Sequence, residues 1–167
     1  MTSEQAVTAL IASLGWKDEE LSHTPERFAG LLREFTPGEL PSVSLFDHDG
    51  TDIVVLEDLP FYSLCVHHLV PFFGHATVAY VPKGKVAGLS CIARSLRHFA
   101  RRPQLQERFA AQLADHLYGA IGAEGLAVRR SARQMCMEMR GAESTGVVHV
   151  TASRGRVTEA LRLASVG

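Results

Sequence analysis

The chain has 167 residues, of which 46% are hydrophobic and 21% charged, and its formal net charge is −1. This composition suits one globular domain, and the balanced charge argues against nucleic acid as a partner. No apolar run of about 18 residues occurs, so we expect no membrane-spanning helix and no membrane partner. Three widely spaced cysteines argue against a disulfide framework and predict a reducing compartment, the cytoplasm.

Helical patterns dominate residues 1–45, which we expect to form an N-terminal helical segment. A first helix is predicted over residues 2–15, because apolar residues recur at helical spacing and Gly15 fits its end. A second helix is predicted over residues 23–35, with Thr24 as its N-cap. The stretch that follows is rich in turn residues and separates this segment from the rest of the chain.

Residues 46–167 are expected to form the main unit, in which strands and helices alternate in blocks. Strand character is indicated over residues 52–59, 75–82, 125–141 and 146–155. Residues 92–121 follow helical spacing, and Pro103 divides them into two helices. This order predicts an α+β fold with helices packed on one face of an antiparallel sheet.

Residues 134–140 read QMCMEMR, and an extended strand would place alternate side chains on opposite faces. The methionines would then form an apolar face, and the other face would carry a thiol beside an amide, a carboxylate and a guanidinium. The residues of this polar face would be Gln134, Cys136, Glu138 and Arg140. Such a face could be one wall of a site, although taken alone it is more often an ordinary solvated strand face.

Residues 65–68 read CVHH, and Cys65 and His68 have the C-x-x-H spacing that lets one turn present two metal ligands. Cys136 would complete a Cys2His set with one open position, which is typical of catalytic zinc. Two alternatives stay open. Cys65 could be a buried cysteine beside hydrogen-bonded histidines, or Cys91 could be a fourth ligand that closes a structural site.

A candidate anion pocket lies at residues 88–94, which read GLSCIAR. A helix is expected to begin here, and its first N–H groups, together with Ser90 and Arg94, would attract an anion. Arg27 and Arg140 could add positive charge to the same pocket.

Gln106 and Glu107 fall early in the long helix. Residues at such positions are usually solvated. A carboxylate directed into a pocket can instead accept two hydrogen bonds from the N1–H and the exocyclic amine of guanine. Both interpretations stay open at this point.

Taken together, these segments resemble the GTP cyclohydrolase I family. The matching segments run in family order from Thr24 into the 150s: TPERFA, CVHHLVPFFGHATVAYVP, AGLS, ARRPQLQERF and CMEMRG. The resemblance implies the tunnelling fold, in which an antiparallel sheet with helices on one side assembles into a toroidal homo-oligomer. Members are usually decamers of two pentameric rings, with active sites between subunits.

The resemblance also assigns roles to single residues. Cys65, His68 and Cys136 match the Zn²⁺ ligands, and His67 matches the catalytic histidine beside the metal. The substrate-binding positions, at the guanine and around the triphosphate, are Glu107, Gln106, Ser90, Leu89, Arg94, Arg140 and Arg27. The implied reaction is hydrolytic opening of the imidazole ring of a guanine nucleotide, as in the conversion of GTP to 7,8-dihydroneopterin triphosphate and formate.

Four positions depart from the family pattern. Val66 stands where the family has an acid, and Gln134 stands at the position of a second catalytic histidine. Glutamine can form hydrogen bonds there but cannot shuttle a proton near neutral pH. Cys91 replaces a phosphate-binding lysine, and Gly30 replaces a basic residue.

These departures leave alternatives open. The chain could be a divergent paralogue that acts on a less phosphorylated guanine compound or on another purine or pterin. It could also stop at the formamide intermediate, or be a non-catalytic binding protein that contains zinc.

Overall fold

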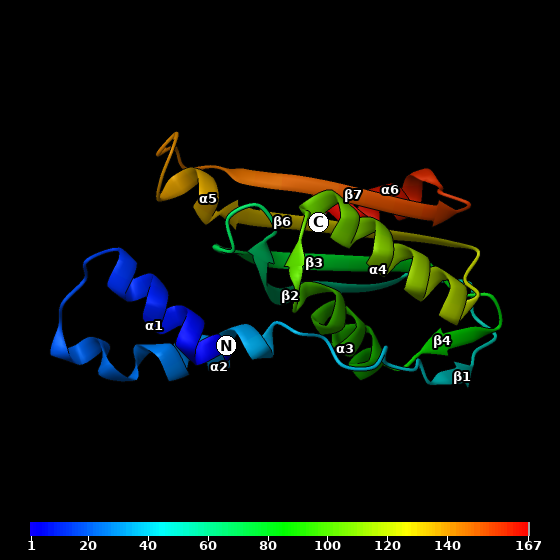
Figure 1. Cartoon of the computed structure of the whole chain (residues 1–167). Helices are drawn as coiled ribbons and strands as arrows, with labels where there is room; N and C mark the ends of the chain where they lie inside the picture. The colour runs from blue at the N-terminus through cyan, green and yellow to red at the C-terminus, as the bar shows by residue number, and fades with distance from the viewer. Residues whose placement is uncertain (167) are drawn as a thin grey trace. The chain divides into compact units, whose positions relative to one another are not determined.

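The structure is a computed structural model that describes residues 1–166, with side chains described as far as residue 165. The chain forms two compact units, Met1–Thr36 and Pro37–Gly167 (Figure 1). The division predicted after residue 45 remains a prediction. Among the described residues, no helix is long and apolar enough to cross a membrane.

The N-terminal unit consists of short helices. Its elements are α1 (Ser3–Ser13), the 3-10 helix η1 (Glu19–His23) and α2 (Thr24–Glu34). Thr2 caps α1 through a capping box, because its hydroxyl accepts from the Gln5 backbone N–H while the Gln5 side chain accepts from the Thr2 N–H. The N-cap of α2 is His23 and not the predicted Thr24, because η1 runs directly into α2 and the helical backbone begins earlier.

The main unit is built on a five-stranded sheet. Its strands are β1 (Leu45–Asp47), β2 (Val54–Cys65), β3 (Pro71–Val81), β4 (Lys85–Ala87), β5 (Pro103–Gln104), β6 (Gly125–Gln134) and β7 (Val147–Gly155). The helices are α3 (Leu89–Ala100), α4 (Gln106–Ile121), α5 (Met135–Glu138) and α6 (Glu159–Val166). The sheet order is β5-β2-β3-β6-β7, with all pairs antiparallel except β2–β5, while β1 and β4 pair separately.

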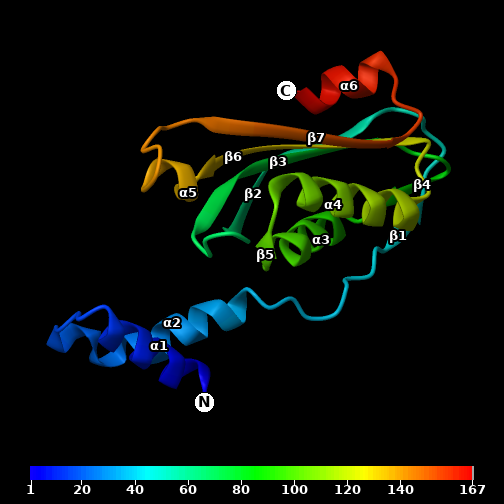
Figure 2. The ribbon, with the colours of Figure 1, turned by 45° about the horizontal axis from the view of Figure 1, so that its top comes forward.

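The two faces of the sheet carry different elements because successive side chains of a strand alternate in direction. Val78 and Val128 are paired in register and belong to the main core, which α3 and α4 cover. Their neighbours Ala79 and Ala127 point to the second face, where they contact Leu161 of α6. Figure 2 shows α6 on the opposite side of the sheet from α3 and α4. The predicted α+β fold is confirmed, and α6 is an element that the sequence analysis did not include.

The strand predicted over residues 125–141 was wrong in its second part. β6 ends at Gln134, and the chain then turns into the short helix α5. Arg133 makes a forked ion pair with Glu138, five residues later. A strand would place these two side chains on opposite faces, so the ion pair favours the turn. The predicted polar strand face therefore does not form; its proposed members were Gln134, Cys136, Glu138 and Arg140.

Candidate metal and substrate site

The CVHH segment forms a tight turn directly after β2. Cys65 closes this turn, because its carbonyl accepts from the Leu69 N–H at 2.8 Å and its N–H donates to the Val70 carbonyl at 2.8 Å. Val66 N–H donates to the Gln104 carbonyl at 3.1 Å, which fixes the turn against β5. As a result, Cys65 Sγ lies 3.8 Å from His68 Nδ1. The C-x-x-H spacing thus brings its thiol and imidazole to one place.

The third predicted ligand reaches the same place from α5. The ligand atoms of Cys65, His68 and Cys136 all lie within 4.8 Å of one another. Burial raises the pKa of the Cys136 thiol, and the neighbouring Cys65 thiol raises this pKa further. A cation bound beside Cys136 would stabilise the thiolate form of this residue. Two thiols and one imidazole are ligands that suit Zn²⁺, so the residues present fit this ion.

Cys91 is not a member of this cluster among the described residues. It is buried at the start of α3, where its sulfur accepts a hydrogen bond from Arg94 Nη2 at 3.1 Å and contacts the Ser44 N–H at 3.4 Å. The Ser44 backbone N–H is the main cause of a lowered pKa of the Cys91 thiol, and the Arg94 charge adds to it. The alternative of a site closed by Cys91 therefore receives no support from the structure.

Arg140 and His67 flank the ligand cluster. Arg140 Nη1 lies 2.8 Å from His68 Nε2, and because a guanidinium can only donate, Nε2 is the acceptor. This contact fixes the orientation of the His68 ring. The exposed His67 ring lies at 87° to the His68 ring, with 6.3 Å between the centroids. His67 is thus adjacent to the cluster without being one of its three members.

A pair of glutamines connects the cluster to α4. Gln106, the first residue of α4, is 5% exposed and donates from Nε2 to the Val148 carbonyl at 2.9 Å. Gln134 donates from Nε2 to Gln106 Oε1. The next residue, Glu107, is exposed in the first turn of α4. Two predicted substrate residues therefore lie beside the end of β6 that leads to Cys136.

The remaining predicted substrate residues lie elsewhere. Leu89, Ser90 and Arg94 are exposed at the start of α3, which follows β4 directly. The other end of α3 leads to β5 (Figure 2), and Gln104 of β5 pairs with Cys65. A helix of 12 residues spans roughly 18 Å, so Leu89 and Ser90 lie at the end of α3 away from β5, and Arg94 lies midway along the helix. Arg27 belongs to the N-terminal unit.

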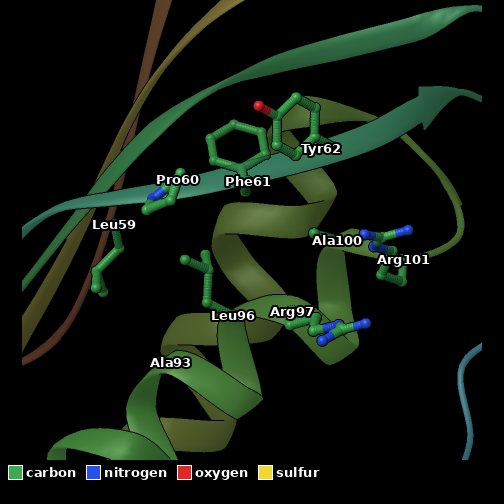
Figure 3. A pocket seen from close by; sticks show the side chains of 9 residues that line it. All are labelled: Leu59, Pro60, Phe61, Tyr62, Ala93, Leu96, Arg97, Ala100 and Arg101. Atoms are coloured by element: carbon green, nitrogen blue, oxygen red, sulfur yellow. The ribbon is translucent and has the colours of Figure 1, made fainter.

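A cavity of about 270 Å³ lies between β2 and α3 (Figure 3). Phe61 and Leu96 give it an apolar lining, and Arg97 and Arg101 also line it. None of the predicted site residues is among its lining residues. It is therefore separate from the ligand cluster.

Sequence reasoning missed Arg130, which is completely buried on the core side of β6. The signal was present, because Val128 and Ala132 flank it at the spacing of one strand face. An arginine in the middle of this pattern indicates a charge directed into the core.

The sequence profile of the GTP cyclohydrolase I family matches residues 3–165. The chain belongs to the GTP cyclohydrolase I family. A protein named GTP cyclohydrolase 1 2 of Pseudomonas syringae pv. tomato is 42% identical over 159 residues, which cover 90% of this chain and 88% of the relative. GTP cyclohydrolase 1 of Geobacillus kaustophilus is 44% identical over 156 residues, which cover 89% of this chain and 83% of the relative.

Solved structures show the fold of this GTP cyclohydrolase I family member. An archaeosine synthase QueF-Like structure in the apo form aligns with a TM-score of 0.54 at 19% identity, covering 66% of this chain and all of the other. A structure assigned as dihydroneopterin aldolase (FolB) of Vibrio cholerae aligns with a TM-score of 0.50 at 14% identity, covering 64% of this chain and 99% of the other. The fold is the predicted tunnelling fold.

Proposed function

We propose that this protein is a Zn²⁺-dependent GTP cyclohydrolase that converts GTP to 7,8-dihydroneopterin triphosphate and formate. The observation that carries the proposal is the convergence of Cys65, His68 and Cys136 in a chain matched by the family profile over residues 3–165. The names and sequence identities of the relatives support the same reaction.

Cys65, His68 and Cys136 would hold a Zn²⁺ ion through two thiolates and one imidazole. Three protein ligands are the number that catalytic zinc sites have. When bound, the ion supplies a Lewis acid that lowers the pKa of water to near neutrality. The chain's own contribution is to bring the ligands from the end of β2 and from α5 together.

His67 is the proton-transfer residue of this proposal. It is exposed beside the cluster, and histidine is the side chain that exchanges protons most readily near neutral pH. Its role is to protonate the purine N7 as the imidazole ring opens. Gln134 contributes hydrogen bonds at the same site but no proton transfer.

Glu107 is the residue that recognises guanine. Its carboxylate accepts hydrogen bonds from the N1–H and the exocyclic amine of the base. Gln106, whose side chain is bonded to both Val148 and Gln134, holds the start of α4 against the sheet beside it. The hydrogen-bonded pair Gln106 and Gln134 thus connects the start of α4, where Glu107 lies, to the segment that carries Cys136.

The complete site is formed between copies of the chain in a toroidal homo-oligomer, a decamer of two pentameric rings. The length of α3 supports this, because Leu89 and Ser90 lie at the end of the helix away from β5, which pairs with Cys65. In the oligomer they bind the triphosphate together with Arg140 and with Arg27 from the N-terminal unit. The three free cysteines support a reducing compartment such as the cytoplasm.

A second candidate substrate is a guanine compound with fewer phosphates. Arg94 donates to the Cys91 sulfur at 3.1 Å, and the Ser44 N–H together with the Arg94 charge lowers the pKa of this thiol. This hydrogen bond engages an Arg94 N–H that would otherwise be available to a phosphate. This contact favours a substrate with fewer phosphates than GTP.

Incubation of the zinc-loaded protein with GTP, GMP and guanosine, followed by mass analysis of the products, tests both candidates. We expect GTP to give dihydroneopterin triphosphate and formate. His67→Ala should keep its zinc and lose about 10²–10⁴-fold in turnover. Cys136→Ser should lose zinc, and the matched control Cys91→Ala should keep it.

Three outcomes would contradict parts of this proposal. Accumulation of a formamide product from GTP would show that the reaction stops before formate leaves. Preferential conversion of GMP or guanosine would establish the second candidate. Full turnover by His67→Ala would remove the assigned role of His67.

A further inference from the structure

Gln104 is a buried residue of the segment ARRPQLQERF to which the proposed function gives no role. It is the second residue of the short strand β5, and it pairs in register with Cys65 of β2. Its main-chain carbonyl accepts from the Val66 N–H at 3.1 Å. Because Val66 lies between Cys65 and His68, this bond acts on the turn that presents two of the three candidate metal ligands.

The side-chain amide of Gln104 is 1% exposed, and each of its hydrogen-bonding groups has a partner. Arg108 donates from Nε to Gln104 Oε1 at 2.7 Å, and because a guanidinium can only donate, this contact identifies the oxygen of the amide. The same oxygen accepts from the Leu105 N–H at 3.3 Å. Nε2 donates to Gln112 Oε1 at 2.7 Å and to the Phe99 carbonyl at 3.4 Å. The orientation of the amide is therefore fixed.

The partners of this amide belong to both helices that cover the sheet. Phe99 is in the last turn of α3, while Arg108 and Gln112 lie one turn apart on α4. The strand β5 has only two residues, so it forms few ladder bonds of its own. A fully satisfied buried polar network is rigid and specifies one arrangement. The Gln104 side chain thus ties β5 to α3 and α4.

The turn that β5 contacts already has a geometry suited to a metal. Two ligands of a tetrahedral Zn²⁺ ion, with bonds of about 2.3 Å to sulfur and about 2.1 Å to nitrogen, lie about 3.6 Å apart. Cys65 Sγ and His68 Nδ1 are 3.8 Å apart. The bonds from Cys65 to Leu69 and Val70 close the turn internally, whereas the Val66 N–H joins it to a separate element. A turn held in this form before the metal arrives loses less conformational freedom on binding.

We propose that Gln104 is a positioning residue for the metal site. Its buried amide fixes β5 between α3 and α4, so that its main-chain carbonyl holds Val66 and thereby the separation of Cys65 and His68. This inference rests on the proposed function, because it takes these ligands to bind Zn²⁺.

Zinc affinity, measured by competition between the protein and a chromogenic chelator, tests this inference. Gln104→Met keeps the length of the side chain and removes all four of its hydrogen bonds. We expect it to bind zinc about tenfold more weakly, at the lower end of the effect of removing a group outside the ligand shell. Gln112→Leu removes one of the four bonds, and we expect a loss of about threefold. This second variant decides the question if Gln104→Met does not fold.

Ser95→Ala is the matched control. The Ser95 side chain is also fully buried, donates to the Cys91 carbonyl at 2.9 Å and lies 3.1 Å from His116 Nε2, so it joins α3 to α4. Its replacement should lower the free energy of unfolding but change zinc affinity by less than twofold. A purely structural role of Gln104 would make the two variants behave alike.

Hydrogen–deuterium exchange of the metal-free chain measures the turn itself. In peptides that contain Val66, Gln104→Met should speed exchange by about tenfold, because weaker holding of the turn affects exchange and zinc binding by the same free energy. Ser95→Ala should leave exchange in these peptides unchanged.

Three results would overturn the inference. These are unchanged zinc affinity in the folded Gln104 and Gln112 variants, equal losses in Gln104→Met and Ser95→Ala, and weaker zinc binding without faster exchange at Val66. Failure of the parent protein to bind zinc would instead refute the proposed function. The exchange measurement needs no metal, so it would still show whether Gln104 holds the turn.

Discussion

At the scale of single residues, Arg130 is the most unusual group of the molecule. Moving a guanidinium from water into a protein core costs several kcal/mol, and stacking on Phe109 and Phe61 returns only part of this. The pKa of Arg130 is lowered to about 9 for the same reason, because burial disfavours the charged form of the guanidinium. The protein therefore gives up stability at this position.

Replacing Arg130 by methionine should stabilise the fold. Apolar replacements of buried charges raise the free energy of unfolding by about 1–4 kcal/mol. Because the folded-state pKa of about 9 lies below the ordinary value of arginine, the folded state binds fewer protons than the unfolded state between these two values. The free energy of unfolding of the parent protein should therefore rise with pH in this window. The difference in free energy of unfolding between Arg130→Met and the parent should become smaller.

Urea denaturation of both proteins at pH 7 and pH 10 measures this difference, with Arg129→Met as the control for loss of a positive charge. An Arg130→Met variant that unfolds at lower urea concentration than the parent at pH 7 would show that the native environment already balances the charge.

At the scale of elements, local signals predicted the helices better than the ends of the strands. Gly122 has φ 67° and ends α4 as a left-handed C-cap, which agrees with the stop predicted there. The end of β6 depends on the ion pair between Arg133 and Glu138. In residues 134–140, methionines alternate with other side chains, and this pattern suits a strand equally well. The turn could therefore not be predicted from local sequence, although it is what carries Cys136 to Cys65.

Long-range packing accounts for the other differences. α6 depends on Leu161 contacting Ala79 and Ala127, which lie on two separate strands. The three ligands, by contrast, could be identified from residue type and from family resemblance, and the structure brings them within 4.8 Å. The sequence could not predict where Arg94 lies relative to these three residues, because its position depends on the direction of α3.

The pairing of β3 with β6 should be intolerant of a side chain at Gly74. A Cβ added there would lie 1.9 Å from the Ser131 carbonyl oxygen and 2.8 Å from Ala132 Cα, both on the backbone of β6. Gly74→Ala should therefore lower the free energy of unfolding by about 3 kcal/mol or more, by strain of the kind that overpacking causes. Chemical denaturation measures this.

Gly119→Ala is the matched comparison for this effect. A Cβ on Gly119, inside α4, would meet nothing within 4 Å. Its helix propensity should raise the free energy of unfolding by up to about 1 kcal/mol. Equal effects of the two substitutions would contradict the close approach of β3 to β6.

At the scale of the whole molecule, the proposed function requires groups from different parts of the main unit. The Cys65–His68–Cys136 cluster lies at the end of β2 and in α5, while Ser90 lies in the first turn of α3 and Arg94 midway along it. Under that proposal, copies of this 18.2 kDa chain would complete one site between them. An isolated subunit should be inactive for this reason.

Light scattering should show an assembly of about 180 kDa, ten chains of 18.2 kDa, for the zinc-loaded protein. Co-expression of His67→Ala with Arg94→Ala then tests whether the site is shared. Random mixing leaves about one site in four with both parts intact, so activity should return to about a quarter of the parent level. A mixed preparation no more active than its two components would show that each chain builds its own site.

The glutamine pair beside the ligands has a fixed polarity. Gln106 Nε2 is committed to the Val148 carbonyl, so its oxygen must face Gln134 and receive the Nε2 hydrogen of that residue. A main-chain carbonyl on β7 thereby fixes the orientation of both amides. A molecule that binds the Gln134 oxygen would have to donate a hydrogen to it, while the second Nε2 hydrogen of Gln134 stays available to an acceptor.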